Sequence, residues 1–169
     1  MIPTNLSTKL HWIGAPAPGK LAIAARPRGG DWLEDELFAW KALGIDTVVS
    51  LLEADEQRDL DLASEGSLSR LYKLDFVSFP IPDRDVPSSS SNPLILLEGL
   101  RQKLLSGKSI VIHCRQGVGR AGMIAASLLT LMGVQPKAAV EMVSAGRGVR
   151  VPETAQQLEW ISSAFAHRG

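Results

Sequence analysis

The chain has 169 residues, a length typical of one domain with a sizeable hydrophobic core. Its 18 basic and 18 acidic residues give a formal net charge of zero, which argues against nucleic acid or an anionic membrane as a partner. The single cysteine excludes an internal disulfide and fits a reducing compartment. We therefore expect a cytoplasmic monomer with no signal peptide in residues 1–5 and no membrane segment.

Short apolar segments alternate with amphipathic ones along the chain. The predicted strands cover residues 10–14, 20–25, 45–52, 74–81 and 110–112. The predicted helices cover residues 31–43, one or two short stretches within 53–70, residues 93–106, 121–132 and 136–145, and a last segment from about 154. This alternation predicts a single α/β domain over residues 1–169, in which helices flank both faces of a parallel-dominated, mixed sheet of about four to five strands.

Signals at the ends of several helices refine these boundaries. Asp31 and Glu34 have the spacing of a capping box, and Asn92 is a favourable N-cap ahead of Pro93. Gly146 is expected to follow the end of the helix that begins near residue 136. Two helices carry an apolar stripe on one face, formed by Leu33, Leu37, Trp40 and Leu43 in the first helix and by Leu158, Ile161 and Phe165 in the last.

Residues 109–133 carry the candidate chemistry, because a β-branched run, a short loop and an apolar helix follow one another there. Cys114 opens the loop and Arg120 closes it. Gly117 and Gly119 allow positive φ, so that backbone N–H groups and the helix N-terminus can converge on a tetrahedral oxyanion. The amides and the guanidinium favour the thiolate of Cys114 over the thiol. The segment therefore predicts phosphoryl transfer through a cysteinyl-phosphate, with Arg120 clamping the phosphoryl oxygens and with no metal or cofactor.

The same loop resembles the H-C-x-x-G-x-x-R signature of the cysteine-dependent protein tyrosine and dual-specificity phosphatases. The residues that carry the resemblance are His113, Cys114, Arg115, Gln116, Gly117, Val118, Gly119 and Arg120. The resemblance covers the chain from about residue 20 and implies the same α/β fold, with the loop residues from 115 to 120 binding the phosphoryl group. One position departs from the family: Ala121 replaces the usual Ser or Thr, whose hydroxyl helps the cysteine leave. This change suggests slower turnover.

A carboxylic acid is needed to protonate the leaving oxygen, and the proline-rich segment 80–87 offers two. The resemblance aligns Asp83 with the general acid of the P-I-x-D loop of dual-specificity phosphatases. Asp85 is the reserve candidate, since an insertion of two residues would exchange them. Alternatively, both aspartates only accept hydrogen bonds from backbone groups of a turn.

Two further side chains are candidate site residues. The sequence from Thr154 to Gln157 resembles the T-x-x-Q element of related phosphatases, in which Gln157 would orient the hydrolytic water; it could equally be solvated on the first turn of a helix. His113 precedes the nucleophile on a strand and should point to the opposite face, so we expect it to hydrogen-bond within the loop and tune the thiol.

The resemblance implies a phosphatase of phosphotyrosine, and also of phosphoserine or phosphothreonine, in protein substrates. Besides Arg120, the loop has only one basic residue, Arg115, which makes phosphoinositides a less favoured substrate. A phosphate-binding pseudophosphatase remains an alternative that only Ala121 favours.

Overall fold

The computed structural model describes residues 7–163, which form a five-stranded sheet in the order β1-β2-β5-β3-β4. β1 pairs antiparallel with β2, and all other neighbours are parallel, as predicted for a parallel-dominated, mixed sheet. The strands are β1 (His11–Ile13), β2 (Leu21–Ala24), β3 (Thr47–Ser50), β4 (Asp75–Ser78) and β5 (Ile110–His113).

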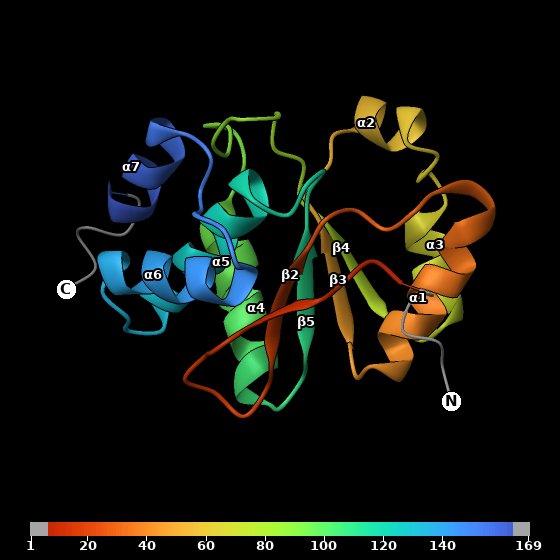
Figure 1. Ribbon diagram of the computed structural model, residues 1–169, viewed down its shortest axis with the longest axis horizontal. Helices are drawn as coiled ribbons and strands as arrows, with labels where there is room; N and C mark the ends of the chain where they lie inside the picture. The colour runs from red at the N-terminus through yellow and green to blue at the C-terminus, as the bar shows by residue number, and fades with distance from the viewer. Residues whose placement is uncertain (1–6, 164–169) are drawn as a thin grey trace.

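Helices cover both faces of this sheet (Figure 1). Between residues 7 and 163 they are η1 (Gly30–Trp32), α1 (Leu33–Ala42), α2 (Ala54–Asp59), α3 (Glu65–Leu71), α4 (Pro93–Leu105), α5 (Gly119–Leu131), α6 (Pro136–Arg147) and α7 (Ala155–Ser163). α1 and α3 lie on one side of the strands, and α4, α5 and α6 lie on the other (Figure 1). None of these helices is long and apolar enough to cross a membrane.

Alternating side chains of the strands feed two hydrophobic cores. On β5, Ile110 and Ile112 join the larger core under α4, α5 and α6, whereas Val111 joins the smaller core under α1. The central strand is therefore apolar on both faces, which explains its continuous β-branched sequence. Trp40 is the largest fully buried side chain and fills the smaller core.

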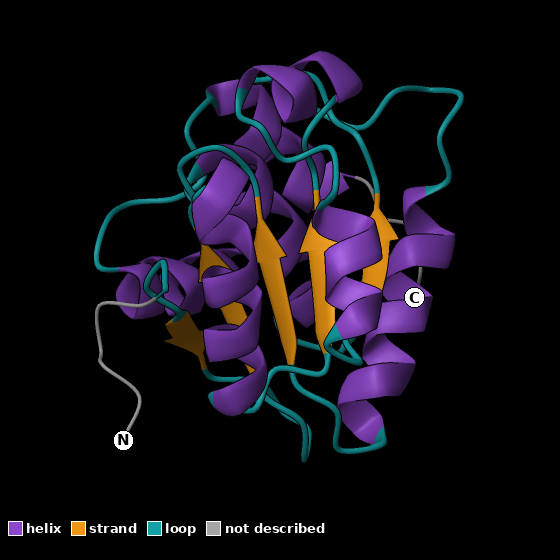
Figure 2. Ribbon diagram, turned by 90° about the vertical axis from the view of Figure 1, so that its right-hand side faces the viewer, coloured by secondary structure: helices purple, strands orange, loops and turns teal. Residues whose placement is uncertain are grey.

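The sheet places the candidate loop at its carboxyl edge. The arrowheads of the parallel strands point to one end of the molecule, where the connecting loops gather (Figure 2). β5 is the central strand between β2 and β3, so the loop that follows it is flanked by the segments that leave both neighbours. Residues from several parts of the chain can therefore reach Cys114.

Some helix boundaries differ from the sequence-based prediction. The expected capping box is wrong, because Asp31 lies inside the short η1 turn and α1 begins at Leu33 with no side-chain cap. α6 does not stop before Gly146; it continues to Arg147, and the left-handed Gly148 ends it. Gly146 thus lies inside the helix, at a point where a Cβ would approach the Trp12 carbonyl oxygen to 2.6 Å, so close packing favours glycine there.

Other predicted features are confirmed or only partly so. Asn92 accepts a hydrogen bond from the Ile95 N–H at 3.3 Å and caps α4 as expected. One residue of each predicted apolar stripe is exposed, because the side chain of Leu43 is 54% accessible to solvent and that of Leu158 is 46% accessible. Phe165, expected on the last helix, lies outside the described residues, as do residues 1–5.

Candidate active site

The loop after β5 folds around the sulfur of Cys114. The side chain is only 3% exposed, and the N–H of Gly117 donates to Sγ at 3.3 Å. A backbone N–H directed at the sulfur stabilises negative charge on it. The predicted strand, loop and helix are thus present, and α5 begins at Gly119, within the loop signature.

The two loop glycines are needed for different reasons. Gly117 has φ +72°, and a Cβ at this position would lie 2.5 Å from the backbone of Ala24 on the neighbouring strand. Gly119 does not have a positive φ, contrary to expectation. A Cβ on Gly119 would instead approach Glu153 Oε2 to 2.9 Å and Gln157 Oε1 to 3.1 Å. Conformation therefore requires the first glycine, and close packing requires the second.

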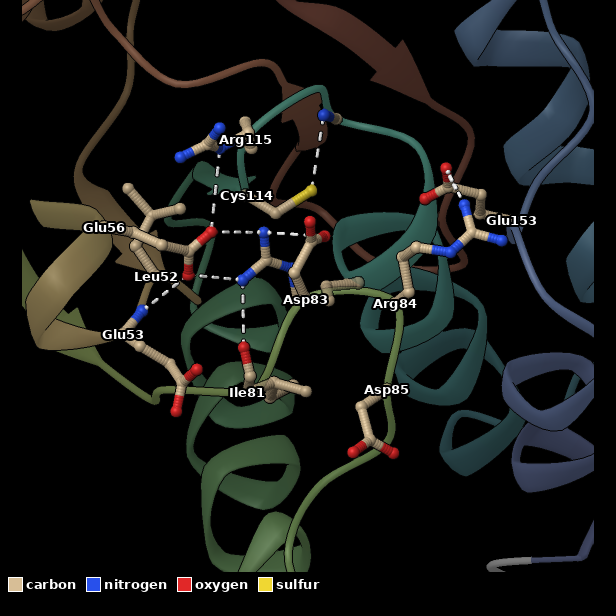
Figure 3. A network of polar contacts seen from close by, with 12 residues as sticks. Leu52, Glu53, Glu56, Ile81, Asp83, Arg84, Asp85, Cys114, Arg115 and Glu153 are labelled. Atoms are coloured by element: carbon tan, nitrogen blue, oxygen red, sulfur yellow. Dashed lines mark hydrogen bonds and ion pairs between the residues drawn. The ribbon is translucent and has the colours of Figure 1, made fainter. Parts of the chain in front are cut away.

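Arg120 is fixed by a buried carboxylate that the sequence did not reveal. Its Nη1 and Nη2 donate to Glu56 Oε2 and Oε1 at 2.7 and 2.9 Å, and Nη1 also donates to the Ile81 carbonyl oxygen at 2.9 Å (Figure 3). The Arg120 side chain is 2% exposed and that of Glu56 is 11% exposed. This bidentate pairing sets the plane of the guanidinium at the mouth of the loop.

Glu56 comes from the first turn of α2, just after β3, where the N–H of Glu53 also donates to its Oε2 at 2.9 Å. Burial alone would raise the pKa of Glu56, but the Arg120 and Glu53 hydrogen bonds and the charges of Arg120 and Arg115 outweigh it and hold that pKa below its usual value. Likewise, burial would lower the pKa of Arg120, but Glu56, Cys114 and Asp83 raise it. The pair is therefore ionised at neutral pH.

The structure separates the two candidate acids. Asp83 Oδ1 lies 3.2 Å from Arg120 Nη2, and its side chain is 58% exposed at the mouth of the loop. Asp85 Oδ1 instead accepts the N–H of Val86 at 2.7 Å, and its carboxylate points away from Cys114 (Figure 3). Asp85 thus shows the turn-stabilising contact expected of an ordinary loop aspartate, whereas Asp83 faces the cysteine loop.

A small cavity of about 60 Å³ lies between these groups. It is lined by Asp83, Arg84, Cys114, Arg115, Gln116, Gly119, Arg120 and Glu153. The predicted nucleophile, acid and arginine therefore line one cavity, together with three of the predicted loop residues. Within residues 7–163, no group of three or more His, Cys, Asp or Glu side chains could hold a metal ion. Reaction without a metal or cofactor stays a prediction.

The acid-bearing segment is attached to the turn before α7. Arg84 adopts φ +63° and pairs with Glu153 at 2.7 Å. Gln157 is fully buried; its Nε2 donates to the Asp85 carbonyl oxygen at 3.0 Å, and its Oε1 accepts the N–H groups of Glu153 and Thr154. Gln157 is therefore not a solvated residue, and the observed contacts connect two loops. Its expected role in orienting water stays a prediction.

His113 lies behind the loop, on the face opposite to the sulfur. Its Nδ1 is 3.3 Å from the Cys114 carbonyl oxygen, and its Nε2 is 2.6 Å from Glu65 Oε2. The side chains of His113 and Glu65 are essentially inaccessible to solvent. The expected hydrogen bond within the loop is present, and Glu65 was not anticipated.

Arg147 is another residue that sequence reasoning missed. From the last turn of α6 it donates through Nε to the Gly117 carbonyl oxygen at 2.9 Å and through Nη2 to the Gln116 carbonyl oxygen at 3.2 Å. These two carbonyl oxygens therefore point toward Arg147 and away from the centre of the loop, an orientation that lets the N–H groups of the same peptides point toward the centre. The sequence signal was weak, because the helix was expected to end before this residue.

The sequence matches the family described as PTP-SAK, Swiss Army Knife protein, DSP-PTPase phosphatase domain, over residues 8–163. It is also 25% identical over 155 residues to "Putative tyrosine phosphatase 197R" of Invertebrate iridescent virus 6. That alignment covers 89% of this chain and 54% of the viral protein, so the chain spans about half the length of this relative.

Several solved structures share the fold. Kinase associated phosphatase, with serine replacing its catalytic-site cysteine, superposes with a TM-score of 0.83 at 19% identity, covering 95% of each chain. The active form of Tk-PTP gives 0.76 at 25% identity, covering 94% of this chain and 97% of that one. PTPMT1 in complex with PI(5)P gives 0.65 at 18% identity, with coverage of 89% and 92%.

Proposed function

Because the chain belongs to the PTP-SAK family of DSP-PTPase phosphatase domains, we propose that it hydrolyses phosphomonoesters through a cysteinyl-phosphate on Cys114. The observation that carries this proposal is the small cavity shared by Cys114, Arg120 and Asp83. A nucleophile, a fixed cation and an exposed carboxylic acid at one cavity are the groups that two-step phosphoryl transfer requires.

In the first step, the thiolate of Cys114 attacks phosphorus and forms the S–P bond while the P–O bond to the leaving group breaks. Asp83 gives its proton to the departing oxygen. In the second step, water attacks the phosphorus, Asp83 takes a proton from that water, and the S–P bond breaks to release inorganic phosphate and the thiolate. Charge on the equatorial oxygens is stabilised by Arg120 and the loop amides throughout.

The contacts of Arg120 indicate how it receives the phosphoryl group. A guanidinium has five N–H donors. The two Nη atoms carry four of these N–H groups, and their four contacts are with Glu56, Ile81 and Asp83. The fifth donor is Nε–H. A phosphoryl group that binds bidentately would take Nε–H and the Nη2–H that now faces Asp83. Binding thus releases Asp83 toward the leaving group.

Phosphotyrosine in proteins is our first candidate substrate, followed by phosphoserine and phosphothreonine, in line with the family resemblance. A second candidate is a phosphoinositide headgroup. Two basic residues favour it, because Arg84 and Arg115 lie at the rim of the cavity with side chains 61% and 44% exposed. They could bind further anionic groups of a substrate. The fold shared with PTPMT1, which was solved with PI(5)P, agrees with this candidate.

The test is hydrolysis of p-nitrophenyl phosphate in EDTA by the unaltered protein and by Cys114→Ser, Asp83→Ala and Asp85→Ala. We expect metal-independent turnover that is lost in Cys114→Ser. Asp83→Ala should lose the pH dependence that reports the general acid, and Asp85→Ala should retain it. Loss of that dependence in Asp85→Ala alone would reassign the acid. Vanadate binding at Cys114 without any turnover would overturn the proposal in favour of a phosphate-binding pseudophosphatase.

Comparison of kcat/KM for phosphotyrosine, phosphoserine and phosphoinositide substrates then decides between the substrate classes. A ratio favouring phosphotyrosine peptides supports the first candidate. A ratio favouring the phosphoinositide refutes it and supports the second.

A further inference from the structure

A buried carboxyl group lies behind the nucleophile and takes no part in the reaction described above. Glu65, the first residue of α3, is separated from His113 by 48 positions in the sequence, yet its Oε2 lies 2.6 Å from His113 Nε2. The side chains of His113 and Glu65 are 0% and 2% exposed. Burying a carboxyl group is costly unless it is paired, so this contact is a defined feature of the fold.

The hydrogen bonds determine how many protons the pair contains. The Cys114 carbonyl oxygen can only accept, so the 3.3 Å contact with His113 Nδ1 requires a proton on Nδ1. The short contact between Nε2 and Glu65 requires a second proton between those two atoms. Whether that proton belongs to the imidazole or to the carboxyl group, the pair is neutral overall and Nδ1 remains a donor.

Without Glu65, the ring could equally carry its single proton on Nε2 and present a bare Nδ1 to the carbonyl oxygen. Both side chains are shielded from solvent, at 0% and 2% exposure, and the centroid of the Trp40 indole ring lies 6.2 Å from that of the imidazole. Glu65 Oε1 has no hydrogen-bond partner among the described residues. The contact of the carboxyl group with Nε2, together with the contact of Nδ1 with the Cys114 carbonyl oxygen, defines a His113 ring that donates from Nδ1.

We propose that Glu65 is a positioning residue for the nucleophile: it holds the proton on His113 Nδ1, and this N–H binds the carbonyl oxygen of Cys114. The inference rests on the proposed role of Cys114 as the nucleophile. A hydrogen bond to that carbonyl polarises the peptide unit between Cys114 and Arg115, which strengthens the Arg115 N–H as a donor inside the loop. It also fixes the backbone that carries the thiolate.

Alkylation of Cys114 by iodoacetate tests this inference without requiring turnover. Cys114 is the only cysteine of the chain, so the rate at about pH 6 reports its thiolate directly. We expect Glu65→Leu to slow alkylation about tenfold, the factor that corresponds to losing about one hydrogen bond's stabilisation of the thiolate. Glu65→Gln should be intermediate, because its amide N–H can donate to Nε2 and so keep the proton on Nδ1.

Glu36→Leu is the matched control, because Glu36 is also a fully buried carboxylate and lies on α1. It binds Arg28 Nε at 2.6 Å and the Thr8 N–H at 2.8 Å, and it does not line the cavity. This control should lose comparable stability but alkylate at a rate within about twofold of the unaltered protein. Glu65→Leu that is folded and alkylates as fast as the control would overturn the inference.

Nitrogen-15 NMR of the histidine rings gives a second test that needs no destabilising variant. We expect His113 Nδ1 to be protonated at neutral pH, and a bare Nδ1 would overturn the inference. Failure of the proposed function is distinguishable, because Cys114 of the unaltered protein would then alkylate slowly and phosphate would not protect it.

Discussion

Replacing Glu56 by glutamine should weaken both the fold and the oxyanion site, because it removes the charge that faces Arg120. The glutamine side chain would be nearly isosteric, but one of its two terminal atoms is an NH₂ group that would point at an N–H of the guanidinium. Arg120 would remain buried at 2% exposure, with one amide oxygen in place of the carboxylate beside the Ile81 carbonyl oxygen and the exposed Asp83.

The magnitude follows from the burial of the pair. Breaking a buried ion pair from one side costs about 3–5 kcal/mol, and a single hydrogen bond to a charged group contributes about 1.5–3 kcal/mol. Since glutamine keeps one acceptor, we expect the free energy of unfolding to fall by about 2–3 kcal/mol. For a chain of this size, that corresponds to a decrease in Tm of about 4–12 °C.

The pH dependence has a defined sign. The pKa of Glu56 is lowered in the folded protein from its ordinary value of 4.5. Its contribution to stability is therefore complete above about pH 4.5 and is lost as the pH falls through the lower folded value. Glutamine does not titrate, so the difference between the two proteins should be constant near neutrality and should narrow below about pH 4.5.

Urea unfolding of both proteins, from about pH 7 to about pH 3.5, measures this difference. The surface pair of Glu98 and Arg101, 3.4 Å apart and more than a third exposed on each side, supplies the control. Glu98→Gln should change the free energy of unfolding by no more than about 0.5 kcal/mol. If Glu56→Gln behaves like Glu98→Gln, or if its deficit is the same at every pH, the buried pair does not stabilise the fold as argued.

Three further substitutions address the loop and its partners. Asp83→Ala should lower turnover about 10²–10⁴-fold through loss of the acid. The same variant should bind vanadate about two- to fivefold more tightly, because the carboxylate that competes for Arg120 is removed. Weaker vanadate binding, measured by calorimetry, would contradict this. Arg147→Leu should raise KM about tenfold, because it frees the Gly117 carbonyl, and an unchanged KM would remove Arg147 from the loop support. Ala121→Ser should accelerate breakdown of the cysteinyl-phosphate, so burst kinetics should show less accumulated intermediate; an undiminished burst would show that the missing hydroxyl does not limit turnover.

The sequence was sufficient to predict the parts of the molecule that contiguous residues define. The β-branched run at 110–112, the loop glycines and the apolar helix after them lie within one short segment, and their order fixes the strand, loop and helix around Cys114. The alternation of strands with helices along the chain also predicted the parallel-dominated sheet with helices on both faces.

The supports of the site could not be predicted in the same way. Glu56 and Glu65 lie 64 and 48 residues from their partners, Arg120 and His113. Their proximity depends on β3 pairing directly with β5, which brings the segments after β3 beside the cysteine loop. An acidic residue on a short polar helix has no local feature that distinguishes a buried partner of arginine from a solvated side chain.

The contacts between the acid-bearing segment and the turn before α7 determine when that segment becomes ordered. Arg84 pairs with Glu153, and the Asp85 carbonyl oxygen accepts from Gln157, so Asp83 lies next to two anchored residues. The segment therefore loses its conformational entropy when the chain folds, and ordering it does not weaken substrate binding. With Asp83 as the proposed proton donor, these contacts predict chemistry without a closing step after the substrate arrives.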